Sequence, residues 1–124
     1  ADADVAVHAM RDALLGAAGL DDIGTYFPDD DPKWKGASSM DLLRRVADLL
    51  KEAHFIIENI DCTIIAERPK LKDYKAQMRK NIAEVLRLSA DRVSVKATTE
   101  EGLGFTGSGE GIAAQAICSL STSA

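Results

Sequence analysis

The stretch from Ser38 to Ala66, SSMDLLRRVADLLKEAHFIIENIDCTIIA, decides the fold because its hydrophobic spacing changes midway from that of a helix to that of a strand. Its first four residues, Ser38 to Asp41, are typical of a helix cap. The apolar residues that follow recur every three or four positions and predict a helix from about Ser39 to Ala53. Residues 55–66 are rich in β-branched side chains and stop before the Arg68-Pro69 breaker, which predicts one long strand with a bend near Asn59.

The same spacing continues on both sides of this stretch. Helical periodicity predicts one helix from Val5 to Ala18, stopped by Gly19, and another from Asp73 to Leu86. A turn at residues 89–91 precedes a predicted strand from Val93 to Thr98, and a glycine-rich segment leads into a final apolar run ending at Leu120. Because strands alternate with helices, we expect an α/β or α+β fold, one domain over residues 1–124, with helices on one face of a sheet.

The charge balance argues against nucleic-acid and anionic-membrane partners. The 124 residues include 15 basic and 20 acidic ones, giving a net charge of -5 without a basic stripe. A phosphate ligand would therefore need local lysines, backbone N–H groups or a cation. No apolar stretch reaches the roughly 18 residues of a membrane span. The two cysteines, Cys62 and Cys118, lie in apolar runs and are interpreted as small buried side chains.

His8 is the first candidate for chemistry. Asp4 precedes it by one helical turn, so the carboxylate shares a face with the imidazole and could orient it, as in metal sites. The alternative is a hydrogen-bonded core or surface histidine. The other histidine, His54, has no such acidic neighbour and is expected to mark the turn between a helix and the long strand.

The segment from Asp21 to Gly36 is a long predicted loop with many aspartates. Carboxylates suit sugar hydroxyls or a hard cation, Gly24 lets the backbone approach a ligand, and Phe27 could cover one. The alternative is a solvated acidic loop.

Two further candidate segments follow the two predicted strands. Residues Ala66 to Leu71 begin at a rigid strand end, where backbone groups, Arg68 or Lys70 could hold a base or a phosphate. Residues Thr98 to Glu101 combine hydroxyls with carboxylates, which suits a phosphate together with a divalent metal. The alternative for the second segment is a threonine-capped turn. The glycine-rich segment 104–111 lacks the lysine of a P-loop.

Four motifs together resemble one family. They are Asp-x-Asp-Val-Ala-x-His-Ala from Asp2, Asp-Ile-Gly-x-x-Phe-Pro-Asp from Asp22, Asp-x-Thr-Ile-Ile-Ala-x-x-Pro-Lys from Asp61, and Lys-Ala-Thr-Thr-x-Glu-x-Leu-Gly-Phe-Thr-Gly from Lys96. In order and spacing they are similar to the 2-C-methyl-D-erythritol 2,4-cyclodiphosphate synthases. The resemblance runs from Ala1 to Leu120.

The resemblance implies a homotrimer with its sheets facing the threefold axis and its active sites between subunits. It implies that 4-diphosphocytidyl-2-C-methyl-D-erythritol 2-phosphate is cyclised with release of CMP, in the methylerythritol phosphate pathway of isoprenoid precursor synthesis. The implied cofactors are Zn²⁺ and either Mg²⁺ or Mn²⁺. The implied location is the bacterial cytoplasm, or the plastid for a plant or apicomplexan source.

Individual residues take roles by the same resemblance. His8 falls on a zinc ligand that Asp4 and Asp12 would support, and Glu101 falls on the ligand of the second divalent ion. Thr98 and Thr99 fall on diphosphate contacts, with Thr99 at the transition state, and Glu100 falls on a further substrate-binding position. The methylerythritol part would be bound by Asp22, Ile23, Gly24, Phe27, Pro28 and Asp29. The cytidine pocket would be Ala66, Glu67, Arg68, Pro69, Lys70 and Leu71. Phe105 would lie near the substrate and Glu110 near the trimer cavity.

The sequence also departs from the family's pattern. No Asp-x-His pair, which supplies two zinc ligands in the family, occurs in the chain, and Ala1 stands where a His-Ser dipeptide would end. We therefore expect an N-terminally incomplete domain with an incomplete zinc site. Arg11, His54 and Arg87 replace smaller residues, and Ser108 replaces a cavity arginine. These departures leave two hypotheses open, an active synthase and a catalytically incompetent or engineered trimeric scaffold.

Overall fold

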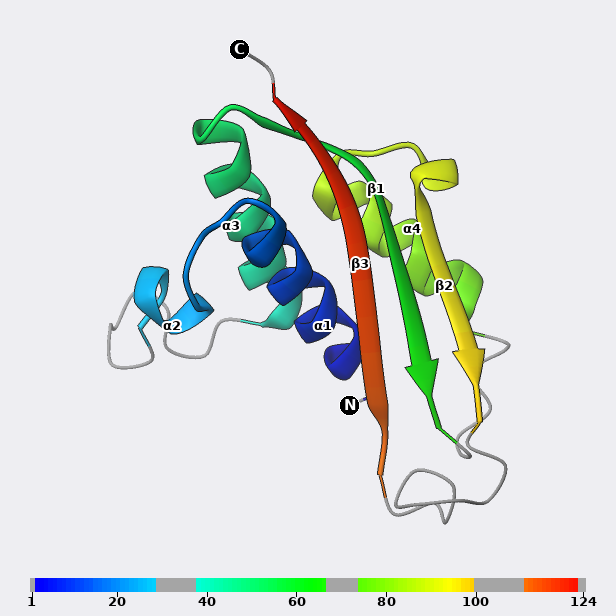
Figure 1. Ribbon diagram of the computed structural model, residues 1–124. Helices are drawn as coiled ribbons and strands as arrows, with labels where there is room; N and C mark the ends of the chain where they lie inside the picture. Colours follow the sequence, from blue (N-terminus) through cyan, green and yellow to red (C-terminus); the bar gives the residue numbers. More distant parts are fainter. Residues whose placement is uncertain (1, 29–37, 67–73, 100–110, 123–124) are drawn as a thin grey trace.

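The computed structural model describes residues 2–28, 38–66, 74–99 and 111–122, and shows helices packed against a sheet (Figure 1). The helices are α1 (Asp2–Ala17), α2 (Ile23–Tyr26), α3 (Ser39–Glu52) and α4 (Lys75–Leu86), with the short 3₁₀ helix η1 (Ala90–Arg92). The strands are β1 (Phe55–Ile65), β2 (Val93–Thr98) and β3 (Ala113–Thr122). This mixed α/β arrangement confirms the fold class predicted from the sequence.

The long strand β1 is the centre of the sheet. The strand order is β2-β1-β3, with β2 parallel to β1 and β3 antiparallel to it. The pairing with β3 is interrupted between Ile57 and Asn59, where the register shifts. The bend predicted near Asn59 is therefore confirmed, and its cause is a β-bulge that leaves Glu58 out of the ladder.

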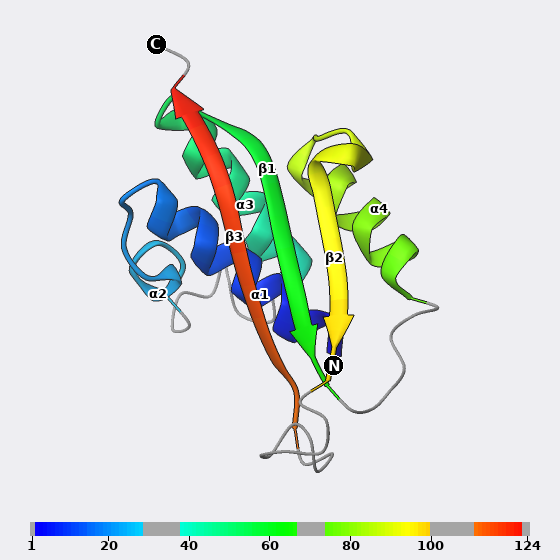
Figure 2. The ribbon, with the colours of Figure 1, turned by 45° about the vertical axis from the view of Figure 1, so that its right-hand side comes forward.

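All the longer helices lie on the same face of the sheet in both ribbon views (Figures 1 and 2). The core forms between this helix layer and β1, because alternate residues of β1 point toward the helices. Its largest fully buried side chains include those of Met10, Leu14, Leu43, Ile60 and Ile64. Arg79 of α4 fixes the start of β2 by donating from Nε to the carbonyls of Ala90 and Val93, at 2.7 and 2.8 Å.

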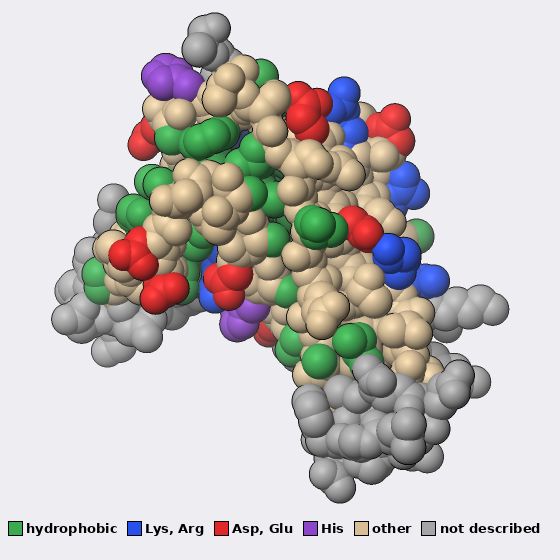
Figure 3. Space-filling view, viewed as in Figure 1, with side chains coloured by type: hydrophobic (Ala, Val, Ile, Leu, Met, Phe, Trp, Pro, Cys, Tyr) green, Lys and Arg blue, Asp and Glu red, His purple; other side chains and the backbone are tan. Residues whose placement is uncertain are grey.

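The opposite face of the sheet is open (Figure 3). Ile117 is 71% exposed there and pairs across the strands with Asp61. The Asp61 Oδ2 atom contacts Lys96 Nζ at 2.7 Å, whereas Asp61 Oδ1 is buried without a hydrogen-bond partner. The cross-strand pair of Ile117 and Asp61 thus places an exposed apolar side chain beside an oxygen that has no hydrogen-bond partner among the described residues.

Several sequence predictions need correction at their boundaries. The first helix begins at Asp2 rather than Val5, since its first turn carries too few apolar residues to show periodicity. The predicted loop from Asp21 to Gly36 contains the one-turn helix α2, and its residues 29–36 lie outside the described part. The final apolar run is strand β3, and the turn predicted at residues 89–91 is the N-cap Ser89 followed by η1, one residue later than predicted. The strand from Val93 to Thr98 has the bounds that its alternation predicts.

None of the helices in the described residues is both long and apolar enough to cross a membrane.

Candidate functional site

The carboxyl ends of β1 and β2 bring two of the predicted segments together. The strands are parallel, Ile65 pairs with Thr98, and the backbone N–H of Ala66 donates to the carbonyl of Thr98 at 3.0 Å. Thr98 and Thr99 are both exposed. The start of the predicted cytidine segment and the predicted diphosphate contacts therefore adjoin at one edge of the sheet, where ligands of α/β proteins commonly bind.

Several predicted site residues lie outside the described residues, and their roles stay predictions. They are Asp29, Glu67, Arg68, Pro69, Lys70, Leu71, Glu100, Glu101, Phe105 and Glu110.

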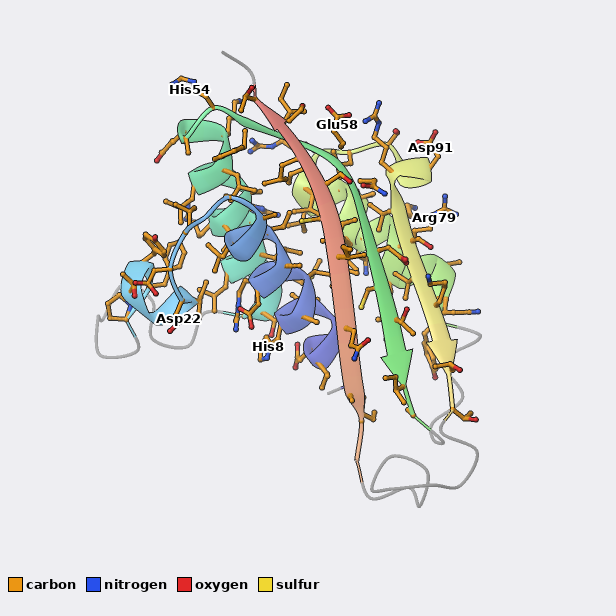
Figure 4. All side chains as sticks on the ribbon, in the orientation of Figure 1. His8, Asp22, His54, Glu58, Arg79 and Asp91 are labelled. Carbon is orange, nitrogen blue, oxygen red and sulfur yellow. The ribbon has the colours of Figure 1, made fainter. Side chains whose placement is uncertain are left out.

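His8 lies on the exposed side of α1 (Figure 4). Its Nε2 atom is 3.4 Å from Oγ of Ser39, the first residue of α3. The Ser39 hydroxyl also hydrogen-bonds the carboxylate of Asp4. Ser39 thus contacts both members of the predicted Asp4–His8 pair.

Ser39 was missed by sequence reasoning because it is 31 positions from His8. The sequence did contain one local indication that Ser39 is free for another contact. A single serine is enough to cap a helix, so one serine of the Ser38-Ser39 pair is not needed for the cap.

Asp12, the other predicted support for His8, is 65% exposed and contacts a different residue. Its Oδ1 atom is 3.4 Å from Nε of Arg11. The Arg11 side chain is only 11% exposed, so its aliphatic part packs against the protein while its head reaches the carboxylate.

The α2 segment places its polar groups in solvent and its aromatic ring in the core. Asp22 and Gly24 are exposed, and a Cβ added to Gly24 would meet nothing within 4 Å, so a ligand has room to approach this backbone. Pro28 and Ile23 are half-buried. Phe27 is only 9% exposed and belongs to the hydrophobic core, so its ring anchors the segment in this structure.

The donor set for a metal is partial in the described residues. No group of three or more His, Cys, Asp or Glu side chains that could hold a metal ion occurs among them. A catalytic zinc site ordinarily has three protein ligands, and the described residues offer His8 as one donor. The completeness of the zinc site therefore stays a prediction.

The cysteines are separate from these candidate residues and are unpaired. Burial, followed by the nearby charge of Asp61, raises the pKa of the Cys62 thiol to about 11. Burial also raises the pKa of Cys118. Both thiols are therefore protonated at neutral pH. Cys62 is fully buried, as predicted, whereas Cys118 is only half-buried because it lies on the edge strand β3.

Comparison with known proteins identifies the family. The profile of the YgbB family matches residues 1–121. A protein of Lachnospira eligens named 2-C-methyl-D-erythritol 2,4-cyclodiphosphate synthase is 64% identical over 121 residues, 98% of this chain and 66% of the relative. A Clostridium perfringens protein of the same name is 60% identical over 119 residues, 96% of this chain and 76% of the relative. The chain thus spans about two-thirds to three-quarters of the length of these relatives.

Solved structures of similar proteins agree with this family assignment. The bifunctional IspDF of Campylobacter jejuni is 48% identical with a TM-score of 0.88, covering 95% of this chain and 32% of that one. The CDP complex of Plasmodium falciparum IspF is 32% identical with a TM-score of 0.83, covering 97% of this chain and 72% of that one. The resemblance carried by the four motifs is therefore confirmed, and the chain belongs to the YgbB family, among relatives named 2-C-methyl-D-erythritol 2,4-cyclodiphosphate synthase.

Proposed function

We propose that the protein is a 2-C-methyl-D-erythritol 2,4-cyclodiphosphate synthase of the methylerythritol phosphate pathway. It converts 4-diphosphocytidyl-2-C-methyl-D-erythritol 2-phosphate into the cyclic diphosphate and CMP. The observation that carries the proposal is the 64% identity, over 98% of this chain, to a relative with that name.

The reaction is an intramolecular phosphoryl transfer. An oxygen of the 2-phosphate attacks the β-phosphorus, and the bond between the β-phosphorus and the oxygen bridging to the α-phosphorus breaks. The electron pair of that bond leaves with CMP. Because nucleophile and leaving group belong to one substrate, the protein has to fold the substrate into line and offset the charge on the phosphoryl oxygens.

The carboxyl ends of β1 and β2 hold the nucleotide half of the substrate. Backbone groups from Ala66 to Leu71 bind the cytosine, and the hydroxyls of Thr98 and Thr99 donate hydrogen bonds to the diphosphate. The Thr99 hydroxyl keeps its hydrogen bond to a β-phosphoryl oxygen in the transition state, where a fixed donor lowers the energy most. The Ala66–Thr98 hydrogen bond supports this arrangement by joining the two segments, as does similarity to IspF structures solved with CDP.

The α2 segment holds the sugar-derived half. The Asp22 carboxylate accepts hydrogen bonds from methylerythritol hydroxyls, and the open space at Gly24 lets the ligand approach the backbone. Divalent cations are the proposed cofactors, zinc at His8 and magnesium or manganese at Glu101. Such ions supply positive charge beside phosphate oxygens when bound.

The proposed assembly is a homotrimer formed through the open face of the sheet, with each site between neighbouring subunits. Two features of that face support it. Ile117 is exposed, and burying it would remove apolar surface from water. The unsatisfied Asp61 Oδ1 also needs a donor, which a neighbouring subunit would provide.

The described residues offer one metal donor, His8, which favours a second candidate function. A trimeric scaffold that binds cytidine nucleotides without turnover would need the strand ends but not the metal ligands.

The test is CMP release from the diphosphocytidyl substrate with added Zn²⁺ and Mg²⁺. His54→Ala is the matched control for His8→Ala, and Glu84→Ala on α4 is the control for Glu101→Ala. We expect metal-dependent CMP release that both site variants abolish and both controls retain. A folded protein that binds CDP but releases no CMP would instead support the scaffold.

A further inference from the structure

The first turn of α3 places two consecutive serines in different environments. Ser38 is the N-cap: its Oγ accepts from the backbone N–H of Asp41 at 3.1 Å, and Asp41 Oδ2 accepts from the backbone N–H of Ser38 at 3.4 Å. This capping box satisfies the helix terminus without Ser39. The Ser39 hydroxyl is therefore left to contact α1.

Ser39 lies between the two polar side chains that α1 directs toward α3. Its Oγ is 3.4 Å from His8 Nε2, and it also hydrogen-bonds the carboxylate of Asp4. Asp4 and Met40 line one small cavity of about 100 Å³, which places Asp4 beside the first turn of α3. The cluster thus joins residues from two helices that share the hydrophobic core.

The direction of the hydrogen bonds follows from the chemistry of the three groups. An ionised carboxylate only accepts, so the Ser39 hydroxyl donates its proton to Asp4. The Ser39 oxygen then keeps lone pairs that accept from an N–H, and the nearest ring atom is His8 Nε2. A neutral imidazole that donates from Nε2 carries its free lone pair on Nδ1.

We propose that Ser39 is a positioning residue, which links Asp4 to His8, holds the imidazole in one orientation and leaves Nδ1 as the nitrogen that binds a ligand. The contact itself is independent of the reaction, whereas its consequence for catalysis rests on the proposed function. The 3.4 Å separation is longer than a typical N–H···O bond, so the link orients the ring and contributes little to stability.

The experiment measures the ring of His8 in the metal-free protein. Three-bond couplings to the His8 Cγ report its side-chain rotamer, and long-range proton–nitrogen spectra report which ring nitrogen carries the proton. Spectra are recorded near pH 8.5, roughly two units above the ordinary histidine pKa of about 6.5. His54 is an internal reference because it follows the end of α3, whereas His8 contacts Ser39 at the start of that helix (Figure 4).

We expect one rotamer and the Nε2–H form for His8 in the wild type. Ser39→Ala should give averaged couplings, and Ser39→Thr, which keeps the hydroxyl, should restore the single rotamer. Ser38→Ala should lower the melting temperature and leave the His8 couplings unchanged. In the turnover assay, Ser39→Ala should lower kcat by about tenfold, as expected for an outer partner of a ligand, and Ser38→Ala should leave it within about twofold.

Equal His8 couplings in the wild type and in folded Ser39→Ala would overturn the inference, as would Nδ1–H as the dominant form. Failure of the proposed function is separate. If the protein releases no CMP but the His8 couplings still depend on Ser39, the reaction is wrong and the positioning role stands. If CMP is released and Ser39→Ala changes neither the couplings nor kcat, the positioning role is wrong and the synthase stands.

Discussion

At the scale of single residues, His54 and Arg87 both occupy backbone conformations that favour glycine. Their φ angles are 66° and 58°, and each follows the end of a helix. The left-handed conformation crowds the Cβ of an L-residue against its own backbone. The family that the sequence resembles has smaller residues at these two positions. The positive φ angles explain why a small residue such as glycine suits them.

Replacing either residue by glycine should stabilise the protein. Relief of the left-handed strain, offset by the greater freedom of unfolded glycine, should raise the free energy of unfolding by about 0.5–1 kcal/mol for His54→Gly. Arg87→Gly should gain less, because Arg87 Nη1 also lies 3.8 Å from Asp48 Oδ1. Urea midpoints at constant m-value measure the difference. His54→Ala is the control, because alanine keeps the strain, and an equal gain from alanine would contradict the argument.

Thr99 is the residue whose proposed role is closest to the reacting atoms. Thr99→Val keeps the shape and removes the hydroxyl, so kcat should fall by about 100-fold, whereas Thr99→Ser should keep most of it. Steady-state rates of CMP release decide this. An active valine variant would show that the hydroxyl is not the transition-state donor.

At the scale of secondary-structure elements, Glu58 of β1 (labelled in Figure 4) joins strand β3 to η1, the short helix that precedes β2. It lies at the β-bulge of β1. Its Oε1 accepts from Ser121 Oγ of β3 at 2.7 Å, and its Oε2 accepts from Arg92 Nη1, just before β2, at 3.1 Å. Arg92 Nη1 also donates to the Glu58 carbonyl at 3.0 Å. The bulge thus carries a link between β2 and β3.

This link should contribute to the acid dependence of stability. The hydrogen bond from Ser121, and then Arg92, lower the pKa of Glu58 below its ordinary value. A lowered folded-state pKa adds stability above the unfolded pKa of about 4.3, and that stability is lost as pH falls through the folded value. Glu58→Gln should therefore flatten the acid limb of a plot of urea midpoint against pH. Glu84→Gln on α4 is the control, and parallel acid limbs for wild type and Glu58→Gln would refute the link.

The elements differ in how far the sequence could predict them. Helix α3 and strands β1 and β2 follow from local spacing, because each buries one face against the same core. Helix α2 could not be predicted, since it has one turn and no periodic apolar face. The antiparallel pairing of β3 with β1 joins residues about half the chain apart, and local patterns carry no information about such pairing. The Ser39–His8 contact was missed for the same reason.

At the scale of the whole molecule, a substitution on the open face of the sheet tests the proposed trimer. An aspartate at position 117 would place a charge where the interface should be apolar, so Ile117→Asp should weaken trimer association by about tenfold or more. Tyr74→Asp is the control, because Tyr74 is also a large exposed side chain, 59% exposed, but lies beside α4. Sedimentation equilibrium measures both. A trimer unaffected by Ile117→Asp would exclude this face as the interface.

The parts of the candidate site were predicted unevenly. The sequence predicted that Ala66 and Thr98 lie at the carboxyl ends of two strands. It did not predict that these strands are parallel neighbours, which brings the two residues together. The substrate could not be read from these residues alone, because hydroxyls and backbone groups at strand ends suit many phosphate ligands. The proposed diphosphocytidyl substrate comes from the family that the four motifs together resemble, and not from these residues one by one.

The central claim is that the 2-phosphate of the substrate, and not water, attacks the β-phosphorus. The most direct test is to run the reaction in ¹⁸O-labelled water and to follow the products by ³¹P NMR and mass spectrometry. We expect one cyclic diphosphate for each CMP and no ¹⁸O in either product. Label in a phosphate of CMP or of an acyclic product would mean that water attacks the substrate and would contradict the proposed cyclisation.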